Sequence, residues 1–525
     1  MRSYYSHLQA VKSTGEEVLI TQKPTFRSSA IFPVLHNNDY SSKVVFMGYW
    51  LLKRNIKEIG LLYTLRSAEG TILSRKYLLI DSAKAFSIQL SEFSDSIDTN
   101  FIGSLELEIF STQDLVYPYP AFVLIYFGDH FSTAVHTVGR IYNDMEDLAK
   151  NEEYKVRESG FDIYGNDNLS PFVAFTNGPV KNDQPQITYE INGPEQKTVK
   201  GSFNISQVKP FETVFIKLKE HIDLATILNG EAGSIKIGHN LEGFFPRFAV
   251  GNFDEHKKSV SITHSYYDCS SLSDEKSFWN RKDELMNDSS VSIPLYITGN
   301  LYTRIAIYPI FSPSDFSLSY AFYNESGQLI KFLEHYHLIK SDENAYEQID
   351  FKSILQKEKI DLDKPKTVNL ICNWQDKNKI PTRVKFGLNI GKESETPELP
   401  TNICFAPQLG NPAVLKKTGT FRWAPFINIG RSEVVLTNSS SLKQYSTPAN
   451  VKLSFHRECD DQRIHREISI PGNGSLTIDL GTDKEISSFL NEKSGWLTAV
   501  SDNPFLNGYY FDFFESGSVG ADHIF

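Results

Sequence analysis

Three histidines stand at the ends of similar short segments that lie far apart in the sequence. His264 and His523 each follow a Ser-Val pair at the same spacing, and His136 follows a serine with the spacing one residue shorter. Imidazole nitrogens are preferred ligands of zinc and other borderline metals, so the three rings could share an ion if the chain folded back on itself. The repeat therefore suggests a metal site or a repeated contact with a ligand or partner.

The long intervals between the histidines argue against a shared metal. Equivalent residues of successive domains lie on the order of tens of ångströms apart, whereas each ligand atom must lie about 2 Å from the metal. We expect instead that each ring caps the last strand of its own domain by a hydrogen bond to the backbone. In the third repeat, Asn402 or Ile403 takes the corresponding place. The prediction is no metal and no cofactor.

Further polar and aromatic residues follow His264. Tyr266 and Asp268 come at alternate positions after it, so a strand would point all three side chains to one face and Cys269 to the other. A Cys–His nucleophile pair is therefore not expected. The three side chains on one face are candidates for contact with a ligand.

An aromatic segment near residue 510 contains Tyr509 and Tyr510. Exposed rings hold sugars, because the flat apolar face of a ring matches the C–H face of a pyranose. Alternation along a strand would bury at least half of these rings in a core. The ligand-binding candidates are therefore His136, His264, Tyr266, Asp268, Tyr509, Tyr510 and His523, and no residue is assigned a catalytic role.

Other motifs give little support to an enzyme. His335 and His337 have the spacing that puts both rings on one face of a strand, but no third ligand for a metal is evident nearby. The sequence has no phosphate-binding loop, dinucleotide-binding glycine motif, His-Glu-x-x-His, nucleophile elbow or EF-hand loop. Common nucleotide-dependent, metalloprotease and hydrolase chemistries are therefore disfavoured.

The elements that must position these residues repeat along the chain. Apolar segments that we align at Pro33, Pro171, Pro294 and Pro425 recur at intervals of roughly 120–140 residues, the size of a domain rather than of a solenoid coil. Proline has no N–H for a strand ladder, so we expect these four to open their strands or to lie at an edge. Alternating segments, a helix-like stretch such as 222–228 or 486–490, and two closing segments follow in each repeat.

This order predicts an all-β fold, a tandem array of about four immunoglobulin- or fibronectin-like β-sandwich domains with short connecting helices. We place an N-terminal extension at 1–26 and the sandwiches at 27–141, 160–272, 289–407 and 408–525. Helical linkers are predicted at 142–159 and 273–288, where aromatic residues would dock a helix and stiffen the junction.

Composition excludes several classes of partner. The 525 residues are 40% hydrophobic and 13% aromatic, enough for several cores. The formal charge of −11 argues against nucleic acid, and no apolar stretch reaches the ~18 residues of a membrane helix, so no membrane insertion is expected. Without an apolar leader we expect a cytoplasmic protein by default. The four cysteines have no paired spacing and are expected to be free.

These observations favour a non-enzymatic multidomain binding or scaffold protein that recognises a glycan or a protein partner. The alternative is an enzyme acting on a carbohydrate or small metabolite at an interdomain cleft, with the three histidines and nearby acids in its site. That alternative would lose its main support if the histidines lay far apart. A structural component of a larger assembly is a third possibility, which predicts self-association.

Overall fold

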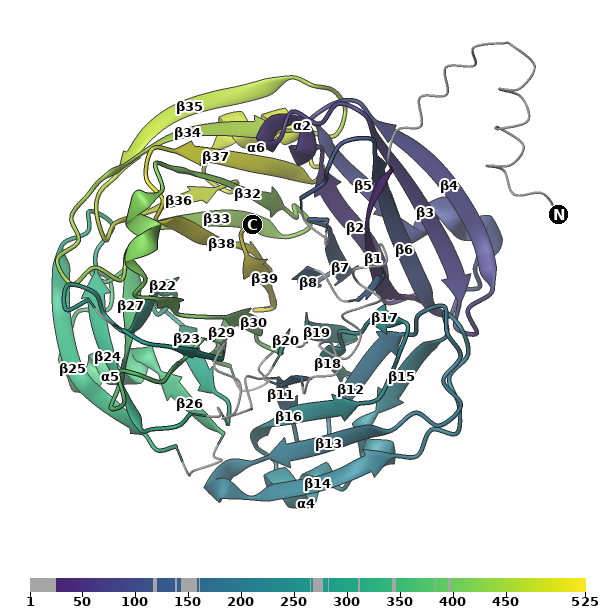
Figure 1. Ribbon diagram of the computed structural model, residues 1–525, viewed down its shortest axis with the longest axis horizontal. Coiled ribbons are helices and arrows are strands. Elements are labelled where there is room, and N and C mark those ends of the chain that lie inside the picture. The colour runs from purple at the N-terminus through teal and green to yellow at the C-terminus, as the bar shows by residue number, and fades with distance from the viewer. Residues whose placement is uncertain are drawn as a thin grey trace, which may run out of the picture.

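Antiparallel β-strands make up 52% of the computed structural model, which is an all-β, multi-domain sandwich fold. The structure describes residues 25–116, 120–136, 139–142, 158–159, 161–264, 266–267, 277–281, 283–309, 312–341, 346–382, 384–394 and 398–525. The larger sheets form four pairs, which we call the first to fourth sheet pairs in chain order. Figure 1 shows them arranged around a ring, with the fourth pair beside the first.

The first sheet pair consists of the sheets β1-β6-β3-β4 and β5-β2-β7-β8. Its elements are β1 (Phe26–His36), β2 (Ser41–Met47), α2 (Tyr49–Lys53), β3 (Ile59–Ser67), β4 (Ile72–Ile80), β5 (Ala85–Gln89), η1 (Leu90–Ser96), β6 (Phe101–Ser111), β7 (Val123–Gly128) and β8 (Phe131–His136). The second pair consists of β14-β13-β16-β10-β20, with β11 beside β16, and β15-β12-β18-β19. Its elements are β10 (Glu158–Ser159), β11 (Asp162–Tyr164), β12 (Leu169–Thr176), β13 (Ile187–Asn192), η3 (Pro194–Gln196), β14 (Thr198–Phe203), β15 (Thr213–Lys217), η4 (Leu218–Glu220), α4 (Leu224–Leu228), β16 (Ala232–His239), β18 (Ala249–Asp254), β19 (Ser259–His264) and β20 (Tyr266–Tyr267). A small sheet joins β9 (Arg140–Ile141) to β17 (Phe244–Phe245).

The third pair repeats this plan in β25-β24-β27-β22-β31 and β26-β23-β29-β30. Its elements are β22 (Ser289–Pro294), β23 (Leu301–Ile307), β24 (Phe316–Tyr323), β25 (Leu329–Ile339), β26 (Glu347–Asp350), α5 (Phe351–Lys357), β27 (Thr367–Trp374), β29 (Phe386–Lys392), β30 (Ile403–Phe405) and β31 (Gln408–Leu409), with β21 (Phe278–Trp279) paired to β28 (Ile380–Pro381). The fourth consists of β32-β37-β34-β35 and β36-β33-β38-β39. Its elements are η6 (Pro412–Lys416), β32 (Thr420–Phe426), β33 (Arg431–Asn438), β34 (Ala449–His456), β35 (Arg463–Ile470), β36 (Ser475–Asp479), α6 (Lys484–Leu490), β37 (Gly495–Ser501), β38 (Leu506–Phe513) and β39 (Val519–His523).

The pattern of burial shows which strands have one face toward solvent and which are covered on both faces. β35 alternates between exposed and partly buried residues, as expected of a strand with one wet face. β19 is buried at every position, because its sheet packs on its partner sheet and also on neighbouring pairs. One edge strand of each pair, β8, β19, β30 or β39, lies toward the middle of the ring, where β8 and β30 each contact both β19 and β39.

Short helices follow β15, β26 and β36 in the last three pairs, as the sequence predicts for 222–228 and 486–490. Asp223, Asp350 and Asp483 each accept a hydrogen bond from the backbone N–H three residues on, and so cap α4, α5 and α6. Among the described residues no helix is long and apolar enough to cross a membrane.

A recurrent backbone contact joins consecutive pairs. The turns after β3, β24 and β34 each accept a hydrogen bond from the first residue of a strand in the next pair, namely β15, β36 and β5 respectively. The N–H groups of Thr213, Ser475 and Ala85 donate to the carbonyls of Ala68, Glu325 and Arg457, at 2.8, 3.0 and 3.1 Å. The contact therefore links the first pair to the second, the third to the fourth, and the fourth back to the first. A ring of this kind closes by head-to-tail contacts.

The predictions for the prolines are confirmed in part. None of the four opens its strand, but Pro33 and Pro425 lie in the edge strands β1 and β32, and Pro294 ends β22, where only β27 pairs with it. Pro171 lies in β12, the counterpart of β2 rather than of β1, so the second repeat is aligned one strand too late. Because proline has no N–H, it requires only a side of the strand that has no hydrogen-bonded partner, and this requirement does not fix where along the strand the proline lies.

The second predicted linker helix is also absent from its described part. Residues 277–281 and 283–288 include the strand Phe278–Trp279 and a bridge from Met286 to Leu442 instead of a helix. The aromatic residues Phe278 and Trp279 thus form a strand of a small sheet. Of the first predicted linker, 143–157 lies outside the described residues, and the domain boundaries remain a prediction. Cys372, Cys404 and Cys459 are free thiols as expected, whereas Cys269 lies outside the described residues.

Candidate functional site

The three histidines of the sequence repeat meet at the middle of the ring. They end or nearly end β8, β19 and β39, and the ring of His136 lies 4.5 Å from that of His264 and 4.4 Å from that of His523, centroid to centroid. The expectation that they lie apart in separate domains is therefore wrong. It assumed a linear array, whereas closure of the ring brings equivalent strand ends together.

Asp522 joins this cluster from the position before His523. One carboxylate oxygen accepts hydrogen bonds from Nδ1 and the backbone N–H of His136, at 2.7 and 3.2 Å. The other accepts from the backbone N–H of His523, at 2.8 Å. Groups of two strands thus hold the Asp522 carboxylate: His136 of β8, and the backbone of β39, to which Asp522 itself belongs.

The surroundings set the charge of the cluster. Burial, reinforced by His136, lowers the pKa of His523 to about 4. Burial alone would raise the pKa of Asp522, but His136 and the N–H of His523 favour the carboxylate, and the pKa lies below its ordinary value. At neutral pH the cluster therefore contains an ionised Asp522 beside a neutral His523. We call His136, His264, Asp522 and His523 the central cluster.

In the third pair Cys404 takes the place of the histidine. It pairs with Gly387 of β29 in the row that crosses the sheet to Ala306 and Gln348, as His136, His264 and His523 lie in the equivalent rows of their own sheets. The assignment of this place to Asn402 or Ile403 is wrong by one or two residues. The short strand β30 gave no alternating pattern long enough to fix its register.

Of the remaining candidates, the structure describes the side chains of Tyr509 and Tyr510. Tyr509 and Tyr510 are each 1% exposed, so their rings pack inside the protein and cannot stack on a sugar. Tyr266 lies in β20, whose backbone pairs with Ser159. Asp268 lies outside the described residues. Alternation would leave Tyr509 and Tyr510 on opposite faces, one of them wet, but both faces of β38 are covered.

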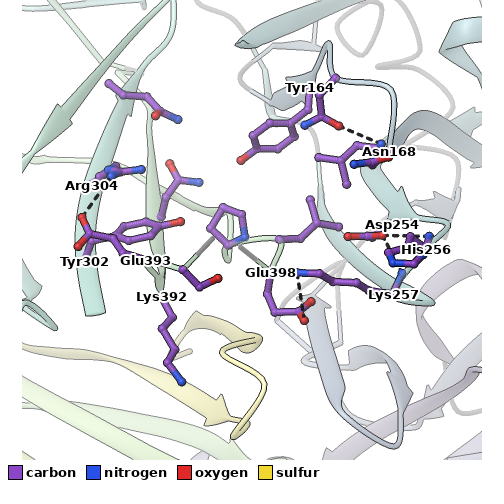
Figure 2. Close-up of a pocket in the computed structure, with 17 residues that line it drawn as sticks. Tyr164, Asn168, Asp254, His256, Lys257, Tyr302, Arg304, Lys392, Glu393 and Glu398 are labelled. Atoms are coloured by element: carbon purple, nitrogen blue, oxygen red, sulfur yellow. Dashed lines mark hydrogen bonds and ion pairs between the residues drawn. The ribbon is translucent and has the colours of Figure 1, made fainter. Parts of the chain in front are cut away.

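A cleft between the second and third pairs provides a second site, which the sequence did not indicate. Its volume is about 480 Å³, within the ~300–1,000 Å³ of small-molecule sites. Figure 2 shows its walls with the lining side chains, among which are the phenol rings of Tyr164 and Tyr302. Four side-chain amides also line it, those of Asn166, Asn168, Gln348 and Asn389. The charged residues of the lining are Asp254, Lys257, Arg304, Lys392, Glu393 and Glu398.

Arg304 and Tyr302 form one wall. The guanidinium centre lies 4.0 Å from the centroid of the tyrosine ring, and its Nε donates to Asp350 at 2.7 Å. Glu393 lies 3.8 Å from the same guanidinium. Burial raises the pKa of Tyr302 to about 12, so its hydroxyl stays protonated and can donate a hydrogen bond at neutral pH.

The other wall belongs to the turn between β18 and β19. Asp254 accepts hydrogen bonds from the backbone N–H groups of His256 and Lys257, at 3.1 and 2.8 Å. The ammonium of Lys257 lies 3.4 Å from Glu398, an ion pair between the second and third pairs. Asp254 pairs with Ser259 at the start of β19, whereas His264 ends that strand. The cleft and the central cluster therefore lie at opposite ends of β19.

A buried carboxyl group links the two pairs that form the cleft. Asp162, 3% exposed, accepts hydrogen bonds from the hydroxyl of Tyr346 at 2.9 Å and from the amide of Asn389 at 2.7 Å. Burial raises its pKa to about 6, although these bonds favour the ionised form. A lone acid between Phe161 and Ile163 is the one sequence signal that could have marked this junction. No motif connects it to partners about 200 residues away.

Comparison with known proteins adds no assignment. No protein-family model matches the sequence, and no curated protein is significantly similar to it.

Proposed function

We propose that this is a non-enzymatic binding protein whose cleft between the second and third sheet pairs holds one or a few residues of a neutral glycan. The observation that supports this most directly is the lining, in which two tyrosine rings stand beside four side-chain amides. A ring face suits the C–H face of a sugar, and amides both donate to and accept from its hydroxyl groups.

The charges of the lining support a neutral ligand. Arg304 pairs with Asp350 and Glu393, and Lys257 with Glu398, so two of the three cations of the lining are already compensated by carboxylates of the protein. The third, Lys392, donates a hydrogen bond to the backbone carbonyl of Glu515. An anionic ligand would have to compete with these carboxylates. A polyol needs only hydrogen bonds, and the charged pairs can supply these without giving up their partners.

Binding can be tested by isothermal titration of the full chain with a panel of neutral and acidic oligosaccharides. We expect a neutral member to bind, and Tyr164→Ala to weaken it at least tenfold, because Tyr164 points into the cleft in Figure 2. Tyr77→Ala is the matched control, since Tyr77 is 64% exposed on β4 of the first pair. Binding of acidic members alone, or an equal effect of both substitutions, would contradict the proposal.

The enzyme alternative is tested on the same samples. The meeting of the three histidines favours it, but the central cluster lies at the far end of β19 from the cleft. Release of reducing ends from a glycan that binds, lost in Tyr164→Ala, would overturn the non-enzymatic assignment.

A further inference from the structure

We propose that the central cluster is a binding site for a divalent metal of the zinc class, with His136, His523 and Asp522 as ligands. Each residue has one ligand atom within 4.8 Å of those of the other two. Donors on a tetrahedral zinc lie about 3.4 Å apart when each bond is about 2.05 Å long. Small changes in side-chain torsion therefore bring the three atoms around one ion.

The hydrogen bonds of the two histidines orient them for this role. Nδ1 of His523 lies 3.0 Å from the carbonyl oxygen of Ile524, which can only accept, so Nδ1 carries the proton and Nε2 keeps its lone pair. Histidines that bind zinc are held in this way, by a carbonyl on the other ring nitrogen. Nδ1 of His136 lies 2.7 Å from an oxygen of Asp522, so an ion bound by both takes the place of the proton between them.

The donor set favours zinc over magnesium or calcium. Two imidazoles and one carboxylate are typical of zinc and other borderline metals, whereas the hard cations take oxygen ligands. The ring of His264 stands 4.5 Å from that of His136, where it can approach as a fourth donor. The single carboxylate would compensate half of the charge of the ion.

The position of the cluster gives the metal a structural consequence. His136 ends β8 of the first pair and Asp522 lies in β39 of the fourth, 386 residues further along the chain. An ion held by both would bridge the two pairs at which the ring closes. Because the metal binds the folded ring and not the separated strands, it would stabilise the closed state.

The test uses the full chain after removal of metals by a chelator. We expect Zn²⁺ to bind with a stoichiometry of one per chain by isothermal titration, and Co²⁺ to give the visible absorption of a site with imidazole ligands. His523→Gln and Asp522→Asn should each weaken Zn²⁺ binding at least tenfold. His335→Gln is the matched control, because the His335 side chain is 60% exposed on β25, away from the cluster.

Zinc binding that His335→Gln removes and His523→Gln leaves unchanged would overturn the proposal, as would the absence of zinc binding. If the variants of the central cluster do not fold, thermal unfolding of the wild-type chain tests the proposal. Zn²⁺ must then raise its thermal midpoint and excess chelator must reverse the rise, and an unchanged midpoint overturns the proposal.

Discussion

Asp162 shows how one buried residue couples the second and third pairs to pH. Its carboxyl group is surrounded by protein and bonded to Tyr346 and Asn389 across the junction. Two neutral donors stabilise the ionised form but do not replace the water that burial removes, so the proton binds more tightly in the folded state.

This residue predicts a fall in stability with rising pH. The pKa is about 6 in the folded protein against 3.8 ordinarily, so the folded state binds the proton more tightly and the contribution is most favourable below pH 4. It decreases as pH rises to about 6 and is constant above. For Asp162→Asn, the free energy of unfolding relative to wild type should therefore rise by about 2 kcal/mol between pH 4 and 7.

Denaturant titrations at a series of pH values measure this difference. Tyr346→Phe provides the complementary variant, since it removes a hydrogen bond that favours the ionised form. The fall in its stability should extend to higher pH than in the wild type. A difference between Asp162→Asn and wild type that is constant with pH would show that the carboxyl group does not titrate in this range.

The docking turns are the elements that connect one pair to the next. In the first pair the turn between β3 and β4 contains Gly70 at φ +85°, and in the third the turn between β24 and β25 contains Gly327 at φ +78°. A Cβ on Gly70 would lie 2.3 Å from the carbonyl oxygen of Pro210, and one on Gly327 2.2 Å from that of Gly472. Both glycines thus satisfy the turn and admit the backbone of the adjacent pair.

Gly70→Ala is therefore expected to lower the stability for two reasons, the left-handed conformation and the clash with Pro210. Gly230→Ala is the matched control, since Gly230 has φ +76° but a Cβ at this position would meet nothing within 4 Å. The control should cost about 1 kcal/mol, and Gly70→Ala at least twice as much. Denaturant titration of both variants measures the difference. Equal losses of stability would mean that the added methyl group at Gly70 does not clash with the second pair.

Much of this element level could be predicted from the sequence. Alternation identified the strands, and the apolar spacing at 486–490 marked α6. Register was less accessible: Pro171 was assigned to the wrong strand, because a proline needs only an unpaired side. The cleft could not be foreseen, since its two walls come from different pairs and each side chain is ordinary in its own segment.

At the scale of the whole molecule, closure of the ring decides which residues meet. The intervals between repeats fix their number and order but not the angle at each junction, which depends on side-chain packing. Among the described residues the recurrent turn contact joins three junctions, and the cleft lies at the fourth, between the second and third pairs. The same closure unites the cores of the first and fourth pairs, together with part of the second, into one buried cluster.

The shared core predicts that a substitution in the first pair can destabilise the fourth pair as well. Tyr49, in α2, is 3% exposed and stacks on Trp423 of β32, with 4.8 Å between ring centroids. Tyr63 is 9% exposed and meets Phe93 within the first pair. Changing either tyrosine to alanine should cost about 3–5 kcal/mol, as removal of large buried rings does. Only Tyr49→Ala removes a contact across the closure.

Hydrogen exchange read by mass spectrometry distinguishes the two variants. We expect the amides of β32 to exchange faster in Tyr49→Ala than in Tyr63→Ala, because opening of the first pair from the fourth exposes the edge strand that carries Trp423. In β13 of the second pair the variants should exchange alike. If β32 responded equally to both substitutions, the first and fourth pairs would unfold as one unit, and the contact of Tyr49 with Trp423 would have no separate part in closing the ring.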